Sequence, residues 1–166
     1  MNKKALMSTI ALLVLTMMIA LPARAKTVEP YESHIEMELI DPGKEPWVSE
    51  EGIMHLKGSY WAGTEEVIVP GGLGTATFEE WYNHLSLDPI TGEGTLSAKW
   101  RLTFPGGTIE GSARGKITEG YLLSGTFVGT HGSGDFEGVR KMGSFEGMLT
   151  SETTAVAEIT GIIVFP

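Results

Sequence analysis

The side chains best suited to chemistry gather in one short segment, residues 78–84, which reads F-E-E-W-Y-N-H. Its carboxyl, phenol and imidazole groups could donate and accept protons, and its indole and amide could hold a ligand. The segment lies inside a longer predicted strand, Thr75–Leu87, and successive residues of a strand point to opposite faces. Which of these groups act together therefore depends on which face is buried.

The two faces of this strand predict different sites. If Trp81 and Asn83 point inward with their neighbours, an aromatic wall and a polar amide would orient a ligand in an apolar pocket. If the other face points inward, Glu80, Tyr82 and His84 form a proton-transfer set, and they are the candidate catalytic residues. A third interpretation is a half-buried rim strand whose polar groups lie in water.

The remaining reactive side chains form no recognisable site. His34, His55, His84 and His131 are not spaced as an H-x-H or H-x-x-x-H pair, and no Cys is present to complete a zinc site. There is no G-x-S-x-G nucleophile motif, and the glycine-rich residues 71–74 precede a predicted strand, which argues against phosphate binding. We therefore expect no metal ion and no cofactor, and binding rather than catalysis.

Regular alternation of apolar and polar residues identifies the elements that must position these groups. The clearest case is Gly94–Phe104, in which Trp100 lies on an apolar face; a turn at 105–107 then leads to a second alternating segment that ends at Ile117, which predicts a hairpin. No segment has helical periodicity. The other predicted strands are Tyr31–Ile40, Ile53–Trp61, Thr75–Leu87, Tyr121–Thr130, Phe136–Leu149 and Thr154–Phe165, with loops at Asp41–Glu51 and Val69–Gly74.

Glycine is abundant, with 22 residues, and a G-[TS]-apolar-x-G motif begins at Gly107, Gly125 and Gly143. Glycines inside strands permit the bulges and strong coiling that a small barrel needs to close. The sequence therefore predicts an all-β fold of about eight antiparallel strands closed into a small up-and-down barrel, with a two-sheet sandwich as the alternative. Trp61 and Trp100 are expected to form walls of its interior and, with Tyr82, to contact any ligand there.

A glycine-rich turn carries a family resemblance. In the motif G-S-G-D-F-E-G, Gly132, Gly134 and Gly138 are expected to shape the turn and Phe136 to pack. This motif, with Thr154–Phe165 as a last strand, resembles the allene oxide cyclase-like barrels, a group that includes the plant dirigent proteins and uncharacterised bacterial exported proteins. The resemblance covers about the last third of the chain. It implies an eight-stranded barrel, often oligomeric, with a cavity for a hydrophobic molecule; the cyclase's catalytic positions are not matched, so it implies no activity.

Residues 1–25 are predicted to be a cleavable signal peptide. A positively charged start, the apolar stretch Ala5–Leu21 and a small-residue exit that ends at Ala25 form the pattern of export signals. Its removal would leave one domain, residues 26–166, without a transmembrane segment. We expect a periplasmic or extracellular location.

The charge balance bears on partners. The formal net charge is −9, which makes nucleic acid an unfavourable partner. The leading hypothesis is an exported barrel that binds a small, partly hydrophobic molecule in its interior. The alternatives are a cyclase- or isomerase-type enzyme acting on a hydrophobic substrate, and an interaction protein of the cell envelope that uses its outer surface. The sequence leaves open whether the chain forms a homo-oligomer.

Overall fold

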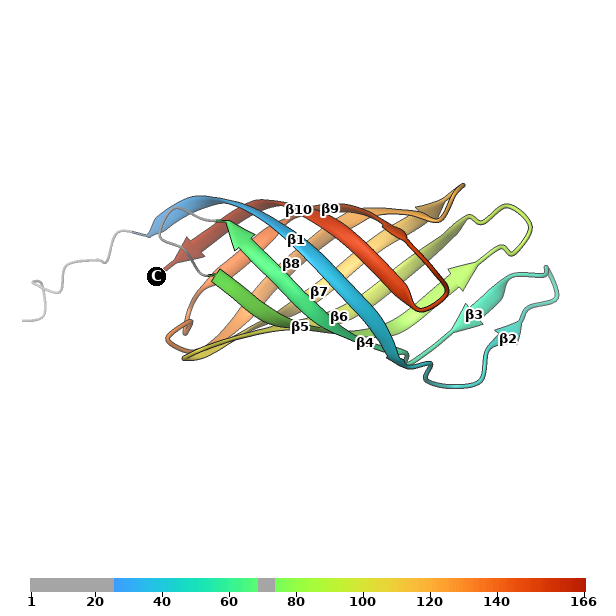
Figure 1. Cartoon of the computed structure of the whole chain (residues 1–166), viewed down its shortest axis with the longest axis horizontal. Coiled ribbons are helices and arrows are strands. Elements are labelled where there is room, and N and C mark those ends of the chain that lie inside the picture. Colours follow the sequence, from blue (N-terminus) through green and yellow to red (C-terminus); the bar gives the residue numbers. More distant parts are fainter. Residues whose placement is uncertain (1–25, 69–73) are drawn as a thin grey trace, which may run out of the picture.

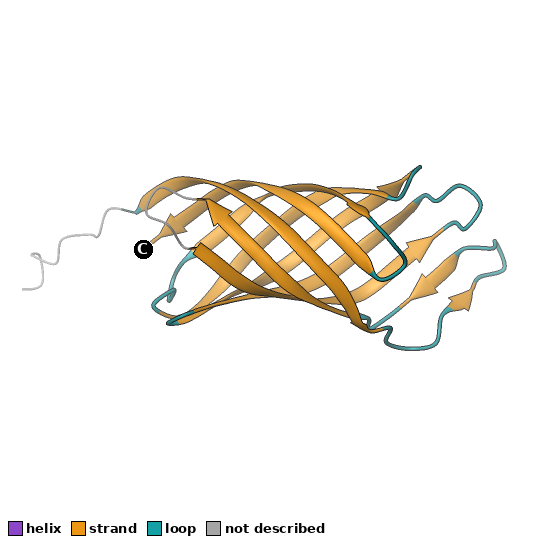
Figure 2. Cartoon of the chain, in the orientation of Figure 1, coloured by secondary structure: helices purple, strands orange, loops and turns teal. Residues whose placement is uncertain are grey.

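The computed structural model describes residues 26–68 and 74–166, and this part of the chain is built from antiparallel strands without a helix (Figures 1 and 2). The strands are β1 (Thr27–Asp41), β2 (Trp47–Val48), β3 (Met54–Leu56), β4 (Tyr60–Ile68), β5 (Gly74–Leu87), β6 (Gly94–Phe104), β7 (Gly107–Thr118), β8 (Leu122–Gly134), β9 (Arg140–Leu149) and β10 (Thr154–Phe165). Among the described residues there is consequently no helix that could cross a membrane.

Eight of these strands close into a barrel. Each strand from β5 to β9 pairs with the strand that follows it in the chain. The last strand, β10, also pairs with β1, and β1 pairs with β4. The pairing of β4 with β5 completes the circle. The predicted eight-stranded barrel is confirmed, and the sandwich alternative is wrong. The two short strands β2 and β3 form a hairpin. In this hairpin β3 pairs with the last residues of β5, at one end of the barrel (Figure 1).

Several predicted boundaries need correction where the chain turns at glycine. The predicted strand Ile53–Trp61 is divided between β3 and β4, because Gly58 takes a positive φ of 80°. The predicted strand Phe136–Leu149 begins only at Arg140, because the preceding residues form a turn in which Gly138 has a φ of 79°. Positive φ values are available to glycine at little steric cost.

The connecting segments also differ from the predictions. The loop expected at Asp41–Glu51 contains β2, and the strand expected to end at Thr130 continues to Gly134. The turn of the G-S-G motif therefore lies at residues 135–138, after the first glycines of the motif. Most of the predicted loop Val69–Gly74 lies outside the described residues, as does the predicted signal peptide.

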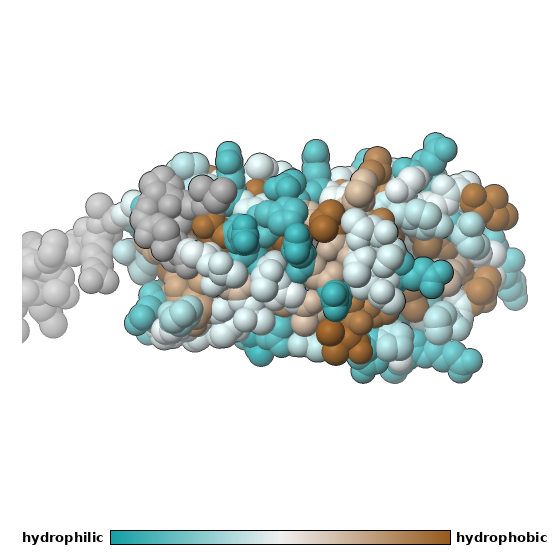
Figure 3. All heavy atoms as spheres, in the orientation of Figure 1, coloured by the Kyte–Doolittle hydropathy of each residue, from teal (hydrophilic) through white to brown (hydrophobic). Residues whose placement is uncertain are grey.

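The inward-facing side chains form one continuous core, and one end of the barrel is plugged. There Phe136, from the turn before β9, packs on Phe104 with ring centroids 4.9 Å apart. Ile109 and Ile163 are fully buried in the core. The outer face seen in Figure 3 is mostly polar, with several apolar side chains at the end where β2 and β3 lie.

Glycines inside the strands make room for aromatic rings in the barrel. A Cβ atom at Gly111 or Gly129 would lie 2.5 or 2.6 Å from the Trp100 ring, which extends across β7 and β8. A Cβ atom at Gly125 would likewise lie 2.6 Å from the ring of Phe145. Such distances are far inside carbon–carbon contact. The glycine-rich strands thus let large rings lie against the barrel wall.

Candidate functional site

The structure determines which face of β5 points into the barrel. Phe78, Glu80 and Tyr82 are buried inside, and Trp81 lies on the outer face. A bulge in the pairing of β5 with β6 lies between Tyr82 and His84, so His84 is exposed on the outside. The strand therefore presents a carboxyl and a phenol to the interior, two residues apart.

Glu80 and Tyr82 are both buried on the inward face of β5, and none of the ion pairs among the described residues involves Glu80. Burial raises the pKa of Glu80 from 4.5 to about 7, and the Tyr82 hydroxyl partly opposes that rise. Burial and the neighbouring carboxyl raise the pKa of Tyr82 well above its ordinary value. Near neutral pH, Glu80 can therefore accept a proton or donate one, while Tyr82 keeps its hydroxyl hydrogen.

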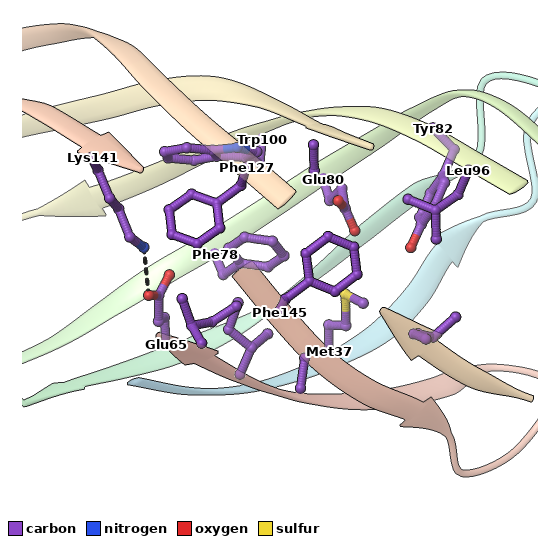
Figure 4. Close-up of a pocket in the computed structure, with 15 residues that line it drawn as sticks. Met37, Glu65, Phe78, Glu80, Tyr82, Leu96, Trp100, Phe127, Lys141 and Phe145 are labelled. Atoms are coloured by element: carbon purple, nitrogen blue, oxygen red, sulfur yellow. Dashed lines mark hydrogen bonds and ion pairs between the residues drawn. The ribbon is translucent and has the colours of Figure 1, made fainter. Parts of the chain in front are cut away.

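A small cavity of about 50 Å³ lies on the barrel axis beside this pair. Figure 4 shows Glu80 near its middle, Tyr82 and Leu96 toward one side, and Glu65 and Lys141 toward the other. Apart from these polar groups the lining is apolar and largely aromatic. The volume suffices for a few water molecules and not for a ligand of drug size.

A larger hollow opens the barrel at the end opposite the Phe104–Phe136 plug. This hollow, here named the cup, has a volume of about 630 Å³ and is formed by strand ends and the β2–β3 hairpin, with apolar side chains such as Leu56, Leu85 and Leu149. Thr150, Ser151 and Glu152 supply polar groups at its wall. Its volume falls in the range of small-molecule sites.

Tyr82 and Leu123 line both the cup and the small cavity. They form the floor of the cup and the boundary between the two spaces. Trp61 stands beside them in the cup wall and meets Tyr82 edge to face, with ring centroids 6.1 Å apart. Of the residues predicted from the sequence, the interior brings together Trp61, Glu80, Tyr82 and Trp100.

A buried ion pair, not anticipated from the sequence, lies on the opposite side of the small cavity. Lys141 Nζ donates to Glu65 Oε1 at 2.6 Å, and Ser33 Oγ donates to the same oxygen at 2.5 Å. Lys141 is 3 % exposed and Glu65 is not exposed at all. Burial raises the pKa of Glu65, an effect that Lys141 opposes, and burial lowers the pKa of Lys141, which Glu65 opposes. The pair has no net charge whichever partner holds the proton.

Three aromatic rings surround the Lys141 amine. Nζ lies 4.0 Å from the ring centroid of Tyr31, 5.1 Å from that of Phe127 and 5.3 Å from that of Trp100. The electron-rich faces of such rings attract a cation, most strongly where water is excluded. Trp100, predicted as an interior wall, thus contacts the ion pair as well as the cavity.

Alternation contained a signal for this ion pair. Glu65 lies at even spacing from Trp61 and Val67, so it shares their inward face, and Lys141 shares the inward face with Phe145 in the same way. A charged residue at an inward position of a barrel strand indicates a buried charge, which normally requires a partner. The partner itself could not be identified, because it comes from a strand far away in sequence.

The other residues predicted for the site lie on the outside. Trp81 stacks on Tyr60 with centroids 5.3 Å apart, under the guanidinium of Arg101 at 5.5 Å. Asn83 is exposed at the bulge of β5. None of these side chains lines the cavity or the cup, so a ligand role for Trp81 or Asn83 would require a separate outer site.

His84 takes part in a separate aromatic stack on the outer side of the β2–β3 hairpin. Its ring lies 5.2 Å from that of His55, with a 3.0 Å contact between ring nitrogens, and Trp47 covers the other side of His55 at 5.1 Å. Within residues 26–68 and 74–166, no group of three or more His, Asp or Glu side chains is arranged to hold a metal ion. The stack fastens the hairpin, and with it part of the cup wall, to β5.

Comparisons with known proteins give a distant structural likeness. No family model and no curated protein matches the chain, so the resemblance to the allene oxide cyclase-like group stays a prediction. One similar solved structure is the Diels–Alderase AbmU from Streptomyces koyangensis, with a TM-score of 0.38, 13 % identity, and coverage of 99 % of this chain and 80 % of that one.

Another similar structure is a nonspecific heme-binding cyclase that catalyses [4 + 2] cycloaddition during neoabyssomicin biosynthesis. Its TM-score is 0.39 and its identity 16 %, with 99 % of this chain and 79 % of that chain covered. These values are too low for the activity of either protein to be transferred to this chain.

Proposed function

We propose that this protein binds a small, partly apolar molecule in the cup, with Tyr82 at its floor. The observation that carries the proposal is an apolar hollow of about 630 Å³ at the open end of a barrel whose other end is plugged. Mostly apolar walls with a few placed polar groups are typical of ligand sites. Export is part of the proposal and depends on residues 1–25.

Neighbouring residues on β9 offer a matched test of the cup. Leu149 lines the cup, whereas Met148 lies on the outer wall, 42 % exposed. The apolar dye Nile red is expected to bind the purified protein and to fluoresce strongly. Leu149→Arg should weaken this binding at least tenfold, because it places a charge in the apolar hollow, about 1.4 kcal/mol being a tenfold change. Met148→Arg should leave it unchanged.

Two results would contradict the proposal: no saturable binding of Nile red or of any apolar compound, or equal loss of binding in both variants. Circular dichroism would show whether both variants keep the strand content of the parent protein. Native mass spectrometry of protein purified from its host would add the mass of a ligand that is retained, together with the oligomeric state.

A second candidate function is an isomerase- or cyclase-type enzyme, and the Glu80–Tyr82 pair favours it. A buried carboxyl with a pKa of about 7 beside a phenol is suited to proton transfer at an apolar substrate. For an unsaturated ketone, the Glu80 carboxylate would remove a proton from the carbon next to the carbonyl. Tyr82 would donate a hydrogen bond to the oxygen, and Glu80 would return the proton at the far end of the conjugated system.

This candidate is tested by incubating apolar β,γ-unsaturated ketones with the protein in D₂O. Wild-type protein should form the conjugated isomer and incorporate deuterium, and Glu80→Gln should abolish both. Glu79→Gln and His84→Ala are the controls, because Glu79 faces outward and His84 is exposed. Equal turnover in Glu80→Gln and wild-type protein would exclude this role for Glu80.

A further inference from the structure

The interior beyond the cup floor contains polar atoms whose hydrogen-bonding capacity is unused. Glu65 Oε1 accepts from both Ser33 and Lys141, but Glu65 Oε2 is buried and has no partner among the described residues. The same holds for Tyr31 Oη and Trp100 Nε1. Buried polar atoms of native proteins nearly always have a partner, so each of these atoms needs an explanation.

The chemical character of Glu65 Oε2 defines what would satisfy it. A carboxylate oxygen accepts hydrogen bonds and does not donate them, so its partner must carry an O–H or N–H group. The partner should also be uncharged, because Lys141 already balances the charge of Glu65 and a further charge would be buried without compensation. A hydroxyl group meets both conditions, whereas a carboxylate meets neither and a hydrocarbon supplies no donor.

The position of this oxygen relates it to the cup. Glu65 and Lys141 line the small cavity, and so do Tyr82 and Leu123, which also form the floor of the cup. Figure 4 shows Tyr82 toward one side of the small cavity and Glu65 and Lys141 toward the other, with Phe145 and Phe78 between them. A narrow chain that passed between Tyr82 and Leu123 would therefore enter the space that ends at the ion pair.

We propose that the ligand of the cup is an alcohol with an unbranched apolar end, whose hydroxyl passes Tyr82 and donates to Glu65 Oε2. This inference rests on the proposed binding function and names the ligand's chemical class. The apolar part lies in the cup and the small cavity, where the lining is mostly apolar. The small volume of the inner cavity excludes a bulky or branched end.

The test compares three eight-carbon probes, 1-octanol, octanoate and octane, by their displacement of Nile red. Wild-type protein should bind octanol at least tenfold more tightly than octanoate, because the anion would be buried beside a charge pair that is already balanced. The double variant Glu65→Leu with Lys141→Met removes both charges at similar volume. It should weaken octanol binding about tenfold and leave octane binding within twofold.

The matched control removes an ion pair from the outer wall. Arg101 Nε donates to Glu110 Oε1 at 2.7 Å, so Arg101→Met with Glu110→Leu makes the same kind of change on the outer face of the barrel. It should leave the affinity for all three probes unchanged. As a measurement that needs no variant, nuclear Overhauser contacts should connect the CH₂OH protons of octanol with the rings of Tyr31 and Phe127.

The outcomes separate this inference from the proposed function. If none of the probes binds, the binding function itself fails. If octane and octanol bind but the Glu65/Lys141 double variant weakens neither, the cup binds ligands and the hydroxyl site is overturned. Octanoate bound as tightly as octanol, or octanol contacts confined to cup residues, would also overturn the hydroxyl site and leave the cup intact.

Discussion

Glu65 and Glu80 are buried in the same barrel interior, on the neighbouring strands β4 and β5, but their surroundings differ. Glu65 has Lys141 at 2.6 Å and Ser33 on the same oxygen, so its charge is balanced within the protein. Among the described residues Glu80 takes part in no ion pair, and burial raises its pKa to about 7. One carboxyl is built into a neutral pair, and the other is left to gain or lose a proton.

The difference divides the buried acidic groups of the interior into two layers. The deep layer holds a charge pair whose hydrogen bonds connect side chains of β1, β4 and β9. The layer under the cup holds a group that titrates near neutral pH, close to where a ligand would enter.

The largest expected effect comes from breaking the deep pair on one side. Lys141→Met leaves the Glu65 carboxyl buried without a cation, and it should destabilise the protein by about 3–5 kcal/mol. Urea denaturation at pH 7, followed by circular dichroism, measures this change. The Glu65→Leu/Lys141→Met double variant should regain most of the loss, since well-packed apolar side chains replace such pairs at little cost. A double variant as unstable as Lys141→Met would show that packing, and not charge balance, makes Lys141 important.

The next largest effect concerns Glu80, where removing the ionisable group is expected to raise the stability of the protein above pH 4.5 and not to lower it. The unfolded chain releases the Glu80 proton above pH 4.5, whereas the folded protein keeps it up to about pH 7, so this group lowers stability as the pH rises between these values. The loss amounts to about 3 kcal/mol. Glu80→Gln cannot ionise, so its stability relative to wild type should increase from pH 4.5 to pH 8 in urea titrations. A difference independent of pH would mean that Glu80 is not held neutral by burial.

Much of the barrel could be predicted from local alternation. The strand Gly94–Phe104 has the predicted bounds, because strict two-residue alternation extends over its whole length and glycines end it cleanly. The predicted strand Ile53–Trp61 has the wrong bounds because β3 and β4 follow each other closely and are separated by a turn in which Gly58 has a positive φ. The β2–β3 hairpin was missed since its strands have only two and three residues, too few for a periodic pattern.

The site could be predicted only in part. Glu80 and Tyr82 were identified together, but the bulge after Tyr82 reverses the face of His84, and nothing in the local sequence marks that extra residue. Glu65 and Lys141 lie 76 positions apart, and they meet because β4 and β9 face each other across the barrel. A contact between distant strands depends on barrel closure and register, which local patterns do not specify.

A smaller effect tests the link between Glu80 and Tyr82. The Tyr82 hydroxyl lowers the pKa of Glu80, so Tyr82→Phe should raise that pKa above about 7. The chemical shift of the Glu80 carboxyl carbon, followed against pH by NMR, measures the change. Tyr60→Phe is the control, because Tyr60 donates to Glu79 on the outer face at 2.8 Å. An unchanged titration of Glu80 in Tyr82→Phe would show that burial alone sets its pKa.

The smallest effect is expected at an ion pair outside the barrel. His34 Nδ1 lies 2.7 Å from Glu158 Oε1, almost the same distance as in the deep pair, but the two side chains are 37 % and 72 % exposed. The hydrogen bond with Glu158 raises the pKa of His34, and partial burial opposes this rise. Its stabilisation is therefore complete below pH 6.5 and is lost as the pH rises through the raised pKa of His34.

Solvent screens this outer pair, so Glu158→Gln should reduce stability by less than about 0.5 kcal/mol at pH 5.5 and by nothing measurable at pH 9. Urea denaturation at both pH values makes the comparison with Lys141→Met direct, since the two pairs have nearly equal lengths. If Glu158→Gln destabilised the protein as much as Lys141→Met, the N–O distance and not the burial would determine how much each ion pair contributes to stability. A much smaller loss of stability in Glu158→Gln than in Lys141→Met would show that Glu65 requires Lys141 because the pair is buried away from water.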